Sequence, residues 1–310
     1  MDAKQKKALR AGFDIYWAEK LAPQLAKKEA LRKRYLTRFF VMLAIALLII
    51  PLIYVLGSLS HGKETFYFNR LVISLLIAGG VFIVQHPYYH YKKHIKQDIM
   101  PLFISYFQGF SYRNGDGLTR DELEDSYIFP RFDTFEADDC FEGVYQDVKM
   151  RVMEERLKVY QHTKNGRREV KVFQGVAVEC DVKKNIKART IVLKDSGIFN
   201  RFKSVGKLER IRLEDVKFEK MFEVFGTDQI ESRRLLTPIF MERLLKLKDL
   251  YQGKSIQFSF QYGKLLIAIA TNQDMFEPFS FFKSNLNRAK VGTVFEQFLT
   301  IFEIIDILKL

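Results

Sequence analysis

Cysteine is scarce in this chain: Cys140 and Cys180 are the two among 310 residues. They form neither a C-x-x-C pair nor a disulfide framework. We therefore expect two small, buried, unpaired side chains in a domain that lies in a reducing compartment.

Histidine is also scarce. Of the five in the chain, His162 is the one in the expected soluble body, and it adjoins an NGRR turn where we expect solvated surface. The other four lie at or near two apolar stretches: His61, His86, His90 and His94. The Walker, G-x-G-x-x-G, H-E-x-x-H and G-x-S-x-G motifs are absent. The scarce histidines and the absent motifs argue against an enzyme, and we predict no catalytic residue and no cofactor.

Two patterns could still hold a metal ion. His86, His90 and His94 are four residues apart and would share one face of a helix, but lysines rather than acids surround them. We interpret them as the end of a membrane helix. The run EADD at 136–139 could bind a hard cation, but it lacks D-x-D-x-D-G spacing, so a solvated acidic loop is favoured. We predict no metal site.

Long uncharged runs are present in the N-terminal third. Residues 39–57 read FFVMLAIALLIIPLIYVLG, which is long enough to cross a hydrocarbon layer of about 30 Å, with a kink at Pro51. Residues 71–91 read LVISLLIAGGVFIVQHPYYHY and form a second predicted span. Its tyrosines are typical of the membrane interface, and Lys92 and Lys93 would reach the headgroups.

Charge asymmetry predicts the orientation. The chain has 50 Lys and Arg against 37 Asp and Glu, a formal charge of +13, and the first 38 residues hold eleven of those cations and four acids. The loop between the spans has one cation, Lys63, before Asn69. By the positive-inside rule we predict a multi-pass protein of the cell inner membrane with both termini cytoplasmic. We expect no cleaved signal peptide, because its charged region would be about 38 residues long.

The basic leader carries an apolar stripe at i+4 spacing, formed by Leu9, Phe13, Trp17, Leu21 and Leu25. This pattern predicts a helix with one apolar face. That face could lie on the anionic inner leaflet, or it could pack on the protein's own cytoplasmic part.

The remaining chain predicts an α+β fold. Runs such as VKVFQGVAVECDV alternate like strands, Asn165 and Gly166 are a hairpin signal, and a second hairpin is expected to turn near Tyr262 and Gly263. No strand-helix-strand alternation recurs, so the sheet should be mainly antiparallel with packed helices. We expect this order: basic leader 1–38, span 39–57, external loop 58–70, span 71–91, helical stalk 92–110, and cytoplasmic α+β domain 111–310.

Two helix starts can be read from residues 218–247. Asp228 and Glu231 have N-cap and N3 spacing, which predicts a capping box that Glu231 closes. Thr237 and Pro238 fit N-cap and N1 of a second helix. Its expected buried stripe is Ile239, Phe240, Leu244, Leu245 and Leu247. A further amphipathic helix is expected at 291–310.

Charge also alternates along the soluble part. Residues 121–147 are rich in acids, and 149–220 are basic. We expect two surfaces that meet, or opposite faces of one sheet.

Residues 218–247, FEKMFEVFGTDQIESRRLLTPIFMERLLKL, resemble the signature of a bacterial family catalogued as domain of unknown function 3137 (DUF3137). In that family an F-x-V-[YF]-x-[TD]-D-Q-x-E-A-R-x-L-L-T-P-x-F-M-x-R-L run follows an F-x-G strand and precedes a β-hairpin. VFQG at 172–175 and SIQFSFQYGKLLIAI at 255–269 match those elements, and Ser232 departs where alanine is common. Paired N-terminal spans are usual there, so the resemblance implies a membrane-tethered cytoplasmic domain of no established activity.

Carried over by position, the motif places Asp228, Gln229, Glu231 and Arg233 together. One interpretation is structural: Asp228 and Glu231 cap a helix, and Arg233 pairs with an acid. The alternative is that the four line a polar binding cleft.

We therefore predict an integral membrane protein that presents a cytoplasmic binding or scaffold domain at the inner membrane. Its partner would be another protein or the anionic leaflet. The alternative is a carboxylate-based hydrolase or transferase acting on membrane-associated substrates. Nucleic acid is not expected as a partner, because much of the positive charge lies in the leader and no recognition motif is present.

Overall fold

The computed structural model describes residues 1–58, 63–164, 166–183, 186–195, 208–251 and 254–310. For residues 54, 56–58, 63–73 and 75–78 it describes the backbone. The chain divides into two compact units. We call residues 11–103 and 278–291 the helical unit, and residues 1–10, 104–277 and 292–310 the sheet unit.

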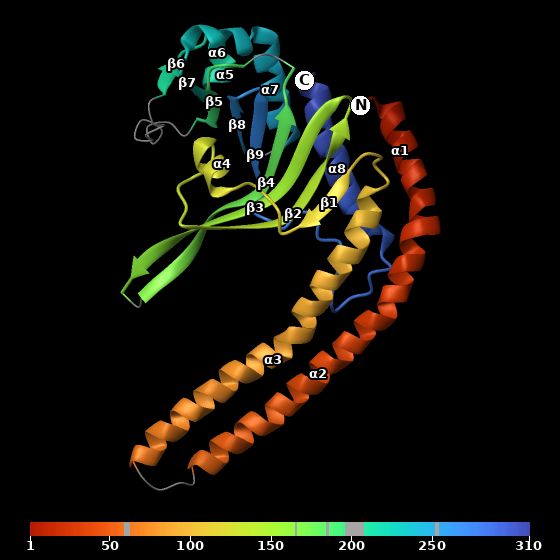
Figure 1. Ribbon diagram of the computed structural model, residues 1–310, viewed down its shortest axis with the longest axis vertical. Coiled ribbons are helices and arrows are strands. Elements are labelled where there is room, and N and C mark those ends of the chain that lie inside the picture. Colours follow the sequence, from red (N-terminus) through yellow and green to blue (C-terminus); the bar gives the residue numbers. More distant parts are fainter. Residues whose placement is uncertain (59–62, 165, 184–185, 196–207, 252–253) are drawn as a thin grey trace. The chain divides into compact units, whose positions relative to one another are not determined.

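Long helices dominate the N-terminal third (Figure 1). Helix α1 (Ala3–Tyr16) continues through a π-helical turn (Trp17–Leu21) into α2 (Ala22–Ser58), and α3 (Lys63–Ile104) follows. The wide turn precedes Pro23, which has no backbone N–H to donate to the preceding turn. In the helical unit α2 and α3 run side by side (Figure 1). Two contacts join them: the Tyr35 hydroxyl lies 2.9 Å from His90 Nδ1, and Lys28 Nζ pairs with Asp98 at 2.5 Å.

The apolar stripe of the leader packs on protein within the helical unit. Phe13, Leu21 and Leu25 are fully buried. The Phe13 ring meets Phe103 edge-to-face at 5.7 Å, and the Tyr16 hydroxyl donates to the carbonyl of Leu102 at 2.7 Å. Of the two placements considered for this stripe, these contacts favour packing on the chain itself.

One stretch of the described chain, Ala3–Ile53, is long and apolar enough to cross a membrane. Its apolar window is not buried: Leu47 is 66% and Leu48 73% exposed. It could therefore serve as a membrane anchor or as a signal sequence. Within the second predicted span, 71–91, the side chains of 71–73 and 75–78 lie outside the described residues, and the two-span arrangement stays a prediction.

In the described part of the sheet unit, nine antiparallel strands form one sheet, as expected for an α+β fold. The order across the sheet is β1-β2-β3-β4-β9-β8-β5-β7-β6. The strands are β1 (Ser111–Asn114), β2 (Thr134–Tyr145), β3 (Val148–Thr163), β4 (Gly166–Asp181), β5 (Thr190–Lys194), β6 (Glu209–Ile211), β7 (Phe222–Gly226), β8 (Ser255–Gln261) and β9 (Lys264–Ala270).

Both predicted hairpins are present. Strands β8 and β9 are joined through Tyr262 and Gly263, whose φ angles of 53° and 70° fit a type I′ turn. Strands β3 and β4 form the other hairpin, and the last pair of residues before its turn is Thr163 and Gly166. Asn165, the first residue of the predicted turn signal, lies outside the described residues.

Helices cover one face of the sheet. They are α7 (Pro238–Leu250) and α8 (Arg288–Leu308), with the short helices α5 (Val216–Glu219) and α6 (Gln229–Leu235) nearby in the chain. Phe240 of α7 packs on Phe260 at 5.8 Å, and Phe298 of α8 packs on Phe141 at 4.6 Å. The prediction was wrong for one residue of α7, because Ile239 is 63% exposed and Met241 is buried in its place.

Helix α4 (Arg120–Asp125) and the segment after it cover part of the opposite face, which we call the α4 face. Leu118, Leu123, Met153 and Ala177 belong to the core beneath it. Both cysteines are buried and unpaired, as predicted. Burial raises the pKa of the Cys140 thiol to about 11, so it is no ready nucleophile.

The acid-rich and basic segments meet through ion pairs. Arg151 on β3 bonds Glu122 of α4 at 3.1 Å, and Lys158 bonds Glu136 of β2 at 2.6 Å. For the acid-rich and basic segments we considered two surfaces that meet or opposite faces of one sheet. These ion pairs show surfaces that meet.

Candidate binding site on the α4 face

The family-motif residues lie at the start of α6, where Asp228 is a helix cap. Its Oδ1 accepts hydrogen bonds from the backbone N–H of Ile230 at 2.8 Å and Glu231 at 2.9 Å. The predicted closure of the cap by Glu231 is wrong, because its Oε1 accepts the backbone N–H of Lys187 at 2.6 Å instead. That N–H lies in the loop before β5, so Glu231 connects α6 to the sheet.

The other two motif residues face outward. Gln229 donates to Glu209 at 3.3 Å, and Arg233 is exposed and forms no ion pair with another described residue. The departure at Ser232 has a local role, since its hydroxyl lies 2.8 Å from that of Thr190 in a buried contact. The four predicted site residues therefore share one helix start, and the hollows described below are lined by other residues.

We expect Asp228→Ala to lower the free energy of unfolding by about 1 kcal/mol, because two backbone N–H groups lose their acceptor. Asp228→Asn keeps an acceptor and should change it by less than about 0.5 kcal/mol. Urea denaturation of the full-length protein in mild detergent measures both. An equal loss in the two variants would contradict a capping role and favour a role for the charge.

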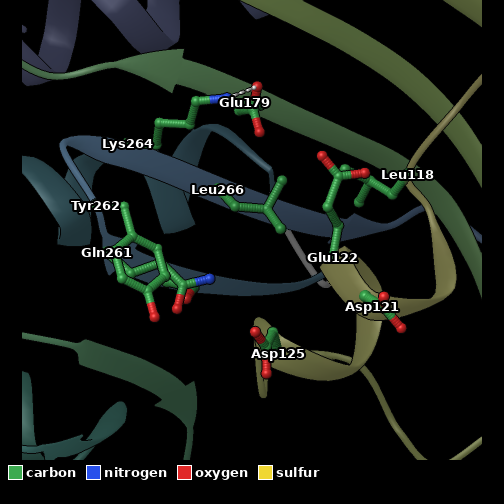
Figure 2. Close-up of a pocket in the computed structure, with 10 residues that line it drawn as sticks. Leu118, Asp121, Glu122, Asp125, Glu179, Gln261, Tyr262, Lys264 and Leu266 are labelled. Atoms are coloured by element: carbon green, nitrogen blue, oxygen red, sulfur yellow. Dashed lines mark hydrogen bonds and ion pairs between the residues drawn. The ribbon is translucent and has the colours of Figure 1, made fainter.

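A hollow of about 350 Å³ opens on the α4 face beside α4 (Figure 2). Helix α4 and Leu118, the residue before the N-cap of α4, form the wall of the hollow. Strands β4, β8 and β9 form its floor. The lining residues are Leu118, Asp121, Glu122, Asp125, Glu179, Ser259, Gln261, Tyr262, Lys264 and Leu266.

Strand register explains the floor. Ser259 on β8 and Glu179 on β4 are both paired with Leu266 on β9, and Gln261 is paired with Lys264. Paired residues of antiparallel strands project to the same face, so these side chains gather on one side of the sheet.

A capping box holds the wall in place. Thr119 Oγ1 accepts the backbone N–H of Glu122 at 3.2 Å, and Glu122 accepts the backbone N–H of Thr119 at 2.7 Å. Burial acts to raise the pKa of Glu122, but the hydrogen bonds from Thr119 and the charge of Arg151 hold it below its ordinary value. Glu122 is therefore ionised at neutral pH.

The rim carries more acid than base. Glu179 accepts from Lys264 at 3.0 Å and from Arg151 at 3.1 Å, so that carboxylate is already compensated. Asp121 and Asp125 are exposed at the rim, and Asp125 has a base, Arg189, at 3.9 Å. Excess negative charge at the mouth favours a cationic ligand.

Two polar atoms in the floor have no hydrogen-bond partner among the described residues. They are Oγ of Ser259, a residue that is fully buried, and Oε1 of Gln261. A buried polar atom without a partner costs about 1–3 kcal/mol. Both can accept a hydrogen bond from a group that enters the hollow, and a group that donates bonds and carries positive charge fits the rim as well.

A second, larger hollow lies on the other side of α4. Its volume is about 950 Å³, and its lining is mostly aromatic and aliphatic, including Tyr127, Phe129, Phe132, Phe173 and Leu193. Aromatic side chains are enriched in the buried core of protein–protein interfaces, which a polar rim surrounds.

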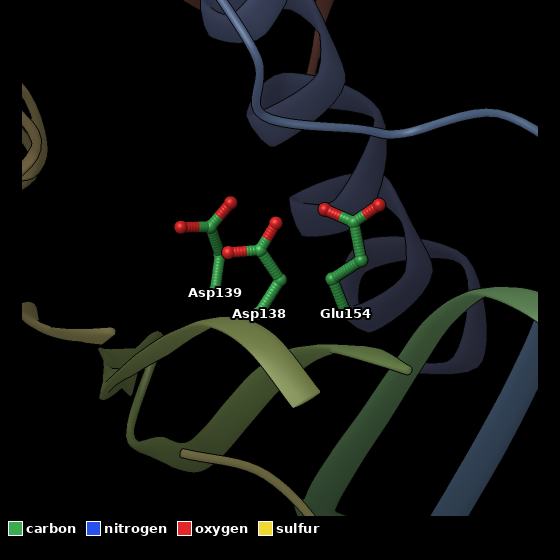
Figure 3. Close-up of side chains that lie close together, drawn as sticks. All are labelled: Asp138, Asp139 and Glu154. Carbon is green, nitrogen blue, oxygen red and sulfur yellow. The ribbon is translucent and has the colours of Figure 1, made fainter. Parts of the chain in front are cut away.

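The acidic run at 136–139 is not the solvated loop that we predicted. It lies in β2, where a bulge places Asp138 and Asp139 opposite Glu154 of β3, and the three carboxylates project to one side (Figure 3). Asp139 is fully buried and accepts from the Tyr112 hydroxyl at 2.7 Å, and Glu154 accepts the backbone N–H of Met275 at 2.8 Å.

The possible ligand atoms of this triad lie within 4.8 Å of one another, so among the described residues this is where a hard cation could be held. His86, His90 and His94 do not form such a group with other described residues. The His90 and His94 ring centroids lie 4.3 Å apart with the rings tilted at 48°, and the His86 ring lies 5.5 Å from that of His90 along the same face of α3.

Comparison with known proteins agrees with the motif. The family model described as protein of unknown function (DUF3137) matches residues 171–310, which confirms the predicted resemblance over that part of the chain. No curated protein matches the chain. Among solved structures, the crystal structure of the mycobacterial trehalose monomycolate transport factor A, TtfA, is similar at 10% identity and a TM-score of 0.33. The match covers 64% of this chain and 88% of that one, and a score this low does not show a common fold.

Proposed function

We propose that the protein is a membrane-anchored binding module. Residues 39–57 and 71–91 cross the cell inner membrane as a hairpin with both termini in the cytoplasm. The sheet unit binds a basic segment of another protein, and the α4 face is the binding surface. No chemical step is part of this proposal.

The surface of α2 and α3 supports the membrane anchor. Large apolar side chains are exposed on both helices, and Phe40, Leu48 and Phe82 are 52%, 73% and 74% exposed. Aqueous helices rarely expose such a continuous apolar surface, whereas a lipid-facing helix requires it. Arg38 and Lys92 mark the ends of these stretches on the side predicted to be cytoplasmic.

The pair of unpartnered acceptors in the floor carries the binding proposal. Ser259 and Gln261 project into a hollow whose rim holds Asp121 and Asp125. The guanidinium of an arginine, or the ammonium of a lysine, offers several donors and a positive charge in one group. Such a side chain would donate hydrogen bonds to the acceptors in the floor and would also neutralise negative charge at the rim.

We expect a fluorescent hexa-arginine peptide to bind the full-length protein in nanodiscs of uncharged phosphatidylcholine. The double variant Asp121→Asn with Asp125→Asn should weaken binding about tenfold, at roughly 0.7 kcal/mol for each rim charge. Gln261→Met should also weaken binding about tenfold, because an acceptor of similar size is lost from the floor. Fluorescence anisotropy measures both dissociation constants.

Asp147→Asn is the matched control for charge. Asp147 is exposed in the β2–β3 turn with φ of 62°, a conformation that asparagine tolerates, and it does not line the hollow. It should leave the affinity unchanged. Equal affinity of the peptide for all these variants would overturn the proposed site.

A further inference from the structure

The segment before α8 belongs to the helical unit, although it is far from α2 and α3 in the sequence. Residues 278–287 read PFSFFKSNLN and pack on those helices. The buried Phe281 ring meets Phe39 at 5.7 Å, Tyr88 at 5.4 Å and Tyr91 at 5.7 Å, each edge-to-face. We call this segment the 278–287 loop.

Hydrogen bonds fix the shape of the loop. Arg32 of α2, which is buried and paired with Glu29 at 2.7 Å, donates to the carbonyl of Phe281 at 2.9 Å. Asn285 is 3% exposed and donates to the Tyr91 hydroxyl at 2.7 Å, and it accepts the backbone N–H of Ser280 at 2.6 Å. The loop is therefore held on the helices by buried polar contacts as well as by rings.

Two large apolar side chains of this fixed loop nevertheless face outward. Phe282 is 55% and Leu286 45% exposed, and the exposed Lys283 lies between them. Single exposed apolar residues are common, but a contiguous exposed apolar patch marks a site of contact with a protein, a membrane or a ligand. What matters is therefore whether Phe282 and Leu286 adjoin other exposed apolar residues.

The exposed part of the loop continues the lipid-facing surface of the helices. Phe282 contacts Phe39 at 5.7 Å and stacks beside Tyr88 at 6.3 Å. Phe40, the next residue on α2, begins the exposed apolar stretch of the predicted span. Aromatic residues at this level are typical of the membrane interface, where the rings lie among the headgroups.

We propose that the 278–287 loop is a third membrane contact of this protein. Phe282 and Leu286 enter the boundary between headgroups and acyl chains of a bilayer that contains anionic lipid. Lys283 reaches the lipid phosphates, together with Arg38 and Lys92 on the flanking helices. This inference rests on the proposed anchoring by α2 and α3, and it adds a site that the family motif does not include.

Tryptophan scanning in vesicles of phosphatidylcholine and phosphatidylglycerol tests the proposal. The full-length chain has one tryptophan, Trp17, which is first replaced by phenylalanine. Single tryptophans are then placed by Phe82→Trp in the anchor, Phe282→Trp in the loop and Tyr262→Trp in the β8–β9 turn. Tyr262 is 75% exposed and serves as the control in the sheet unit. Lipids brominated on the acyl chains quench tryptophans that touch them.

We expect quenching at Phe82→Trp and Phe282→Trp that is at least roughly twofold stronger than at Tyr262→Trp. Quenching at Phe82→Trp but not at Phe282→Trp would overturn the loop contact and leave the anchor intact. Absence of quenching at Phe82→Trp would overturn the anchor itself. Leu286→Trp repeats the loop measurement if Phe282→Trp does not fold, and a loop covered by a second protein rather than lipid would leave both unquenched.

Discussion

Replacing Glu155 with glutamine is expected to stabilise the protein by about 3 kcal/mol near pH 8 and to leave its stability near pH 4 unchanged. Glu155 lies on β3 and is fully buried under the loop that precedes α4. Its Oε1 accepts the backbone N–H of Leu118 at 2.7 Å, and its Oε2 has no hydrogen-bond partner among the described residues. Burial raises the pKa of Glu155 to about 7, and the nearby Glu122 acts in the same direction.

The direction of the pH effect follows from this raised pKa. Below about pH 4.5 the carboxyl is protonated in the folded and unfolded states, and ionisation costs nothing. Between about pH 4.5 and pH 7 the unfolded chain loses the proton while the folded chain keeps it, so stability falls as pH rises. Above pH 7 the full cost of a buried carboxylate is present. Glutamine stays neutral at every pH in the series, so the variant lacks the free-energy cost of a buried carboxylate.

Urea denaturation of the full-length protein in mild detergent, followed by circular dichroism over a pH series, measures the difference. Glu242→Gln is the control, because Glu242 is 66% exposed on α7 and pairs only with Lys246 among the described residues. It should change stability by less than about 0.5 kcal/mol at any pH. A gain at Glu155→Gln that did not vary with pH would show that ionisation of this residue is not its cause.

Local chemistry explains which elements could be predicted from the sequence. The β8–β9 turn at Tyr262 and Gly263 and the cap at Asp228 depend on residues within a few positions of one another. Thr237 and Pro238 begin α7 as expected for the same reason. The antiparallel sheet was predicted on a different ground, because no strand-helix-strand alternation recurs along the chain.

The hollow on the α4 face could not be predicted, because its floor depends on strand order. β4, β9 and β8 are neighbours only after the sheet forms, and the described chain between Glu179 and Ser259 includes six other elements of the sheet unit. One signal was present in the sequence. Ser259 alternates with Phe258 and Phe260 in a strand that is buried on both faces, and a polar residue there needs a reason.

Two errors have a common physical origin in contacts between distant segments. Glu231 had the spacing of a capping box, but a backbone N–H at Lys187 competes for its carboxylate. We predicted a solvated loop at 136–139 because the run is acidic, but the run lies in β2, where a bulge places Asp138 and Asp139 opposite Glu154. Spacing along the chain predicts neither, because the deciding partner comes from another strand or loop.

Gly175→Ala is expected to destabilise the sheet unit by about 3 kcal/mol or more, and to reduce the yield of folded protein. Gly175 ends the VFQG stretch of the family motif and pairs with Ala270 on β9. A Cβ at this position would lie 2.0 Å from the carbonyl oxygen of Ile269 and 2.9 Å from the backbone N of Thr271. Backbone atoms cannot rotate away as a side chain can, so β4 and β9 would have to separate.

The same contact explains why the loss should spread beyond one residue. The carbonyl of Gln174, next to Gly175, accepts the backbone N–H groups of Thr271 and Asn272 at 3.0 Å each, and these bonds hold the end of β9 across β4. Gly79→Ala is the matched control, since a methyl group there would meet no atom of the described side chains and backbone within 4 Å. It should leave the urea midpoint of the full-length protein unchanged. A wild-type midpoint for Gly175→Ala would mean that the two strands do not approach this closely, and the floor of the hollow, which depends on the same β4–β9 register, would then be misplaced as well.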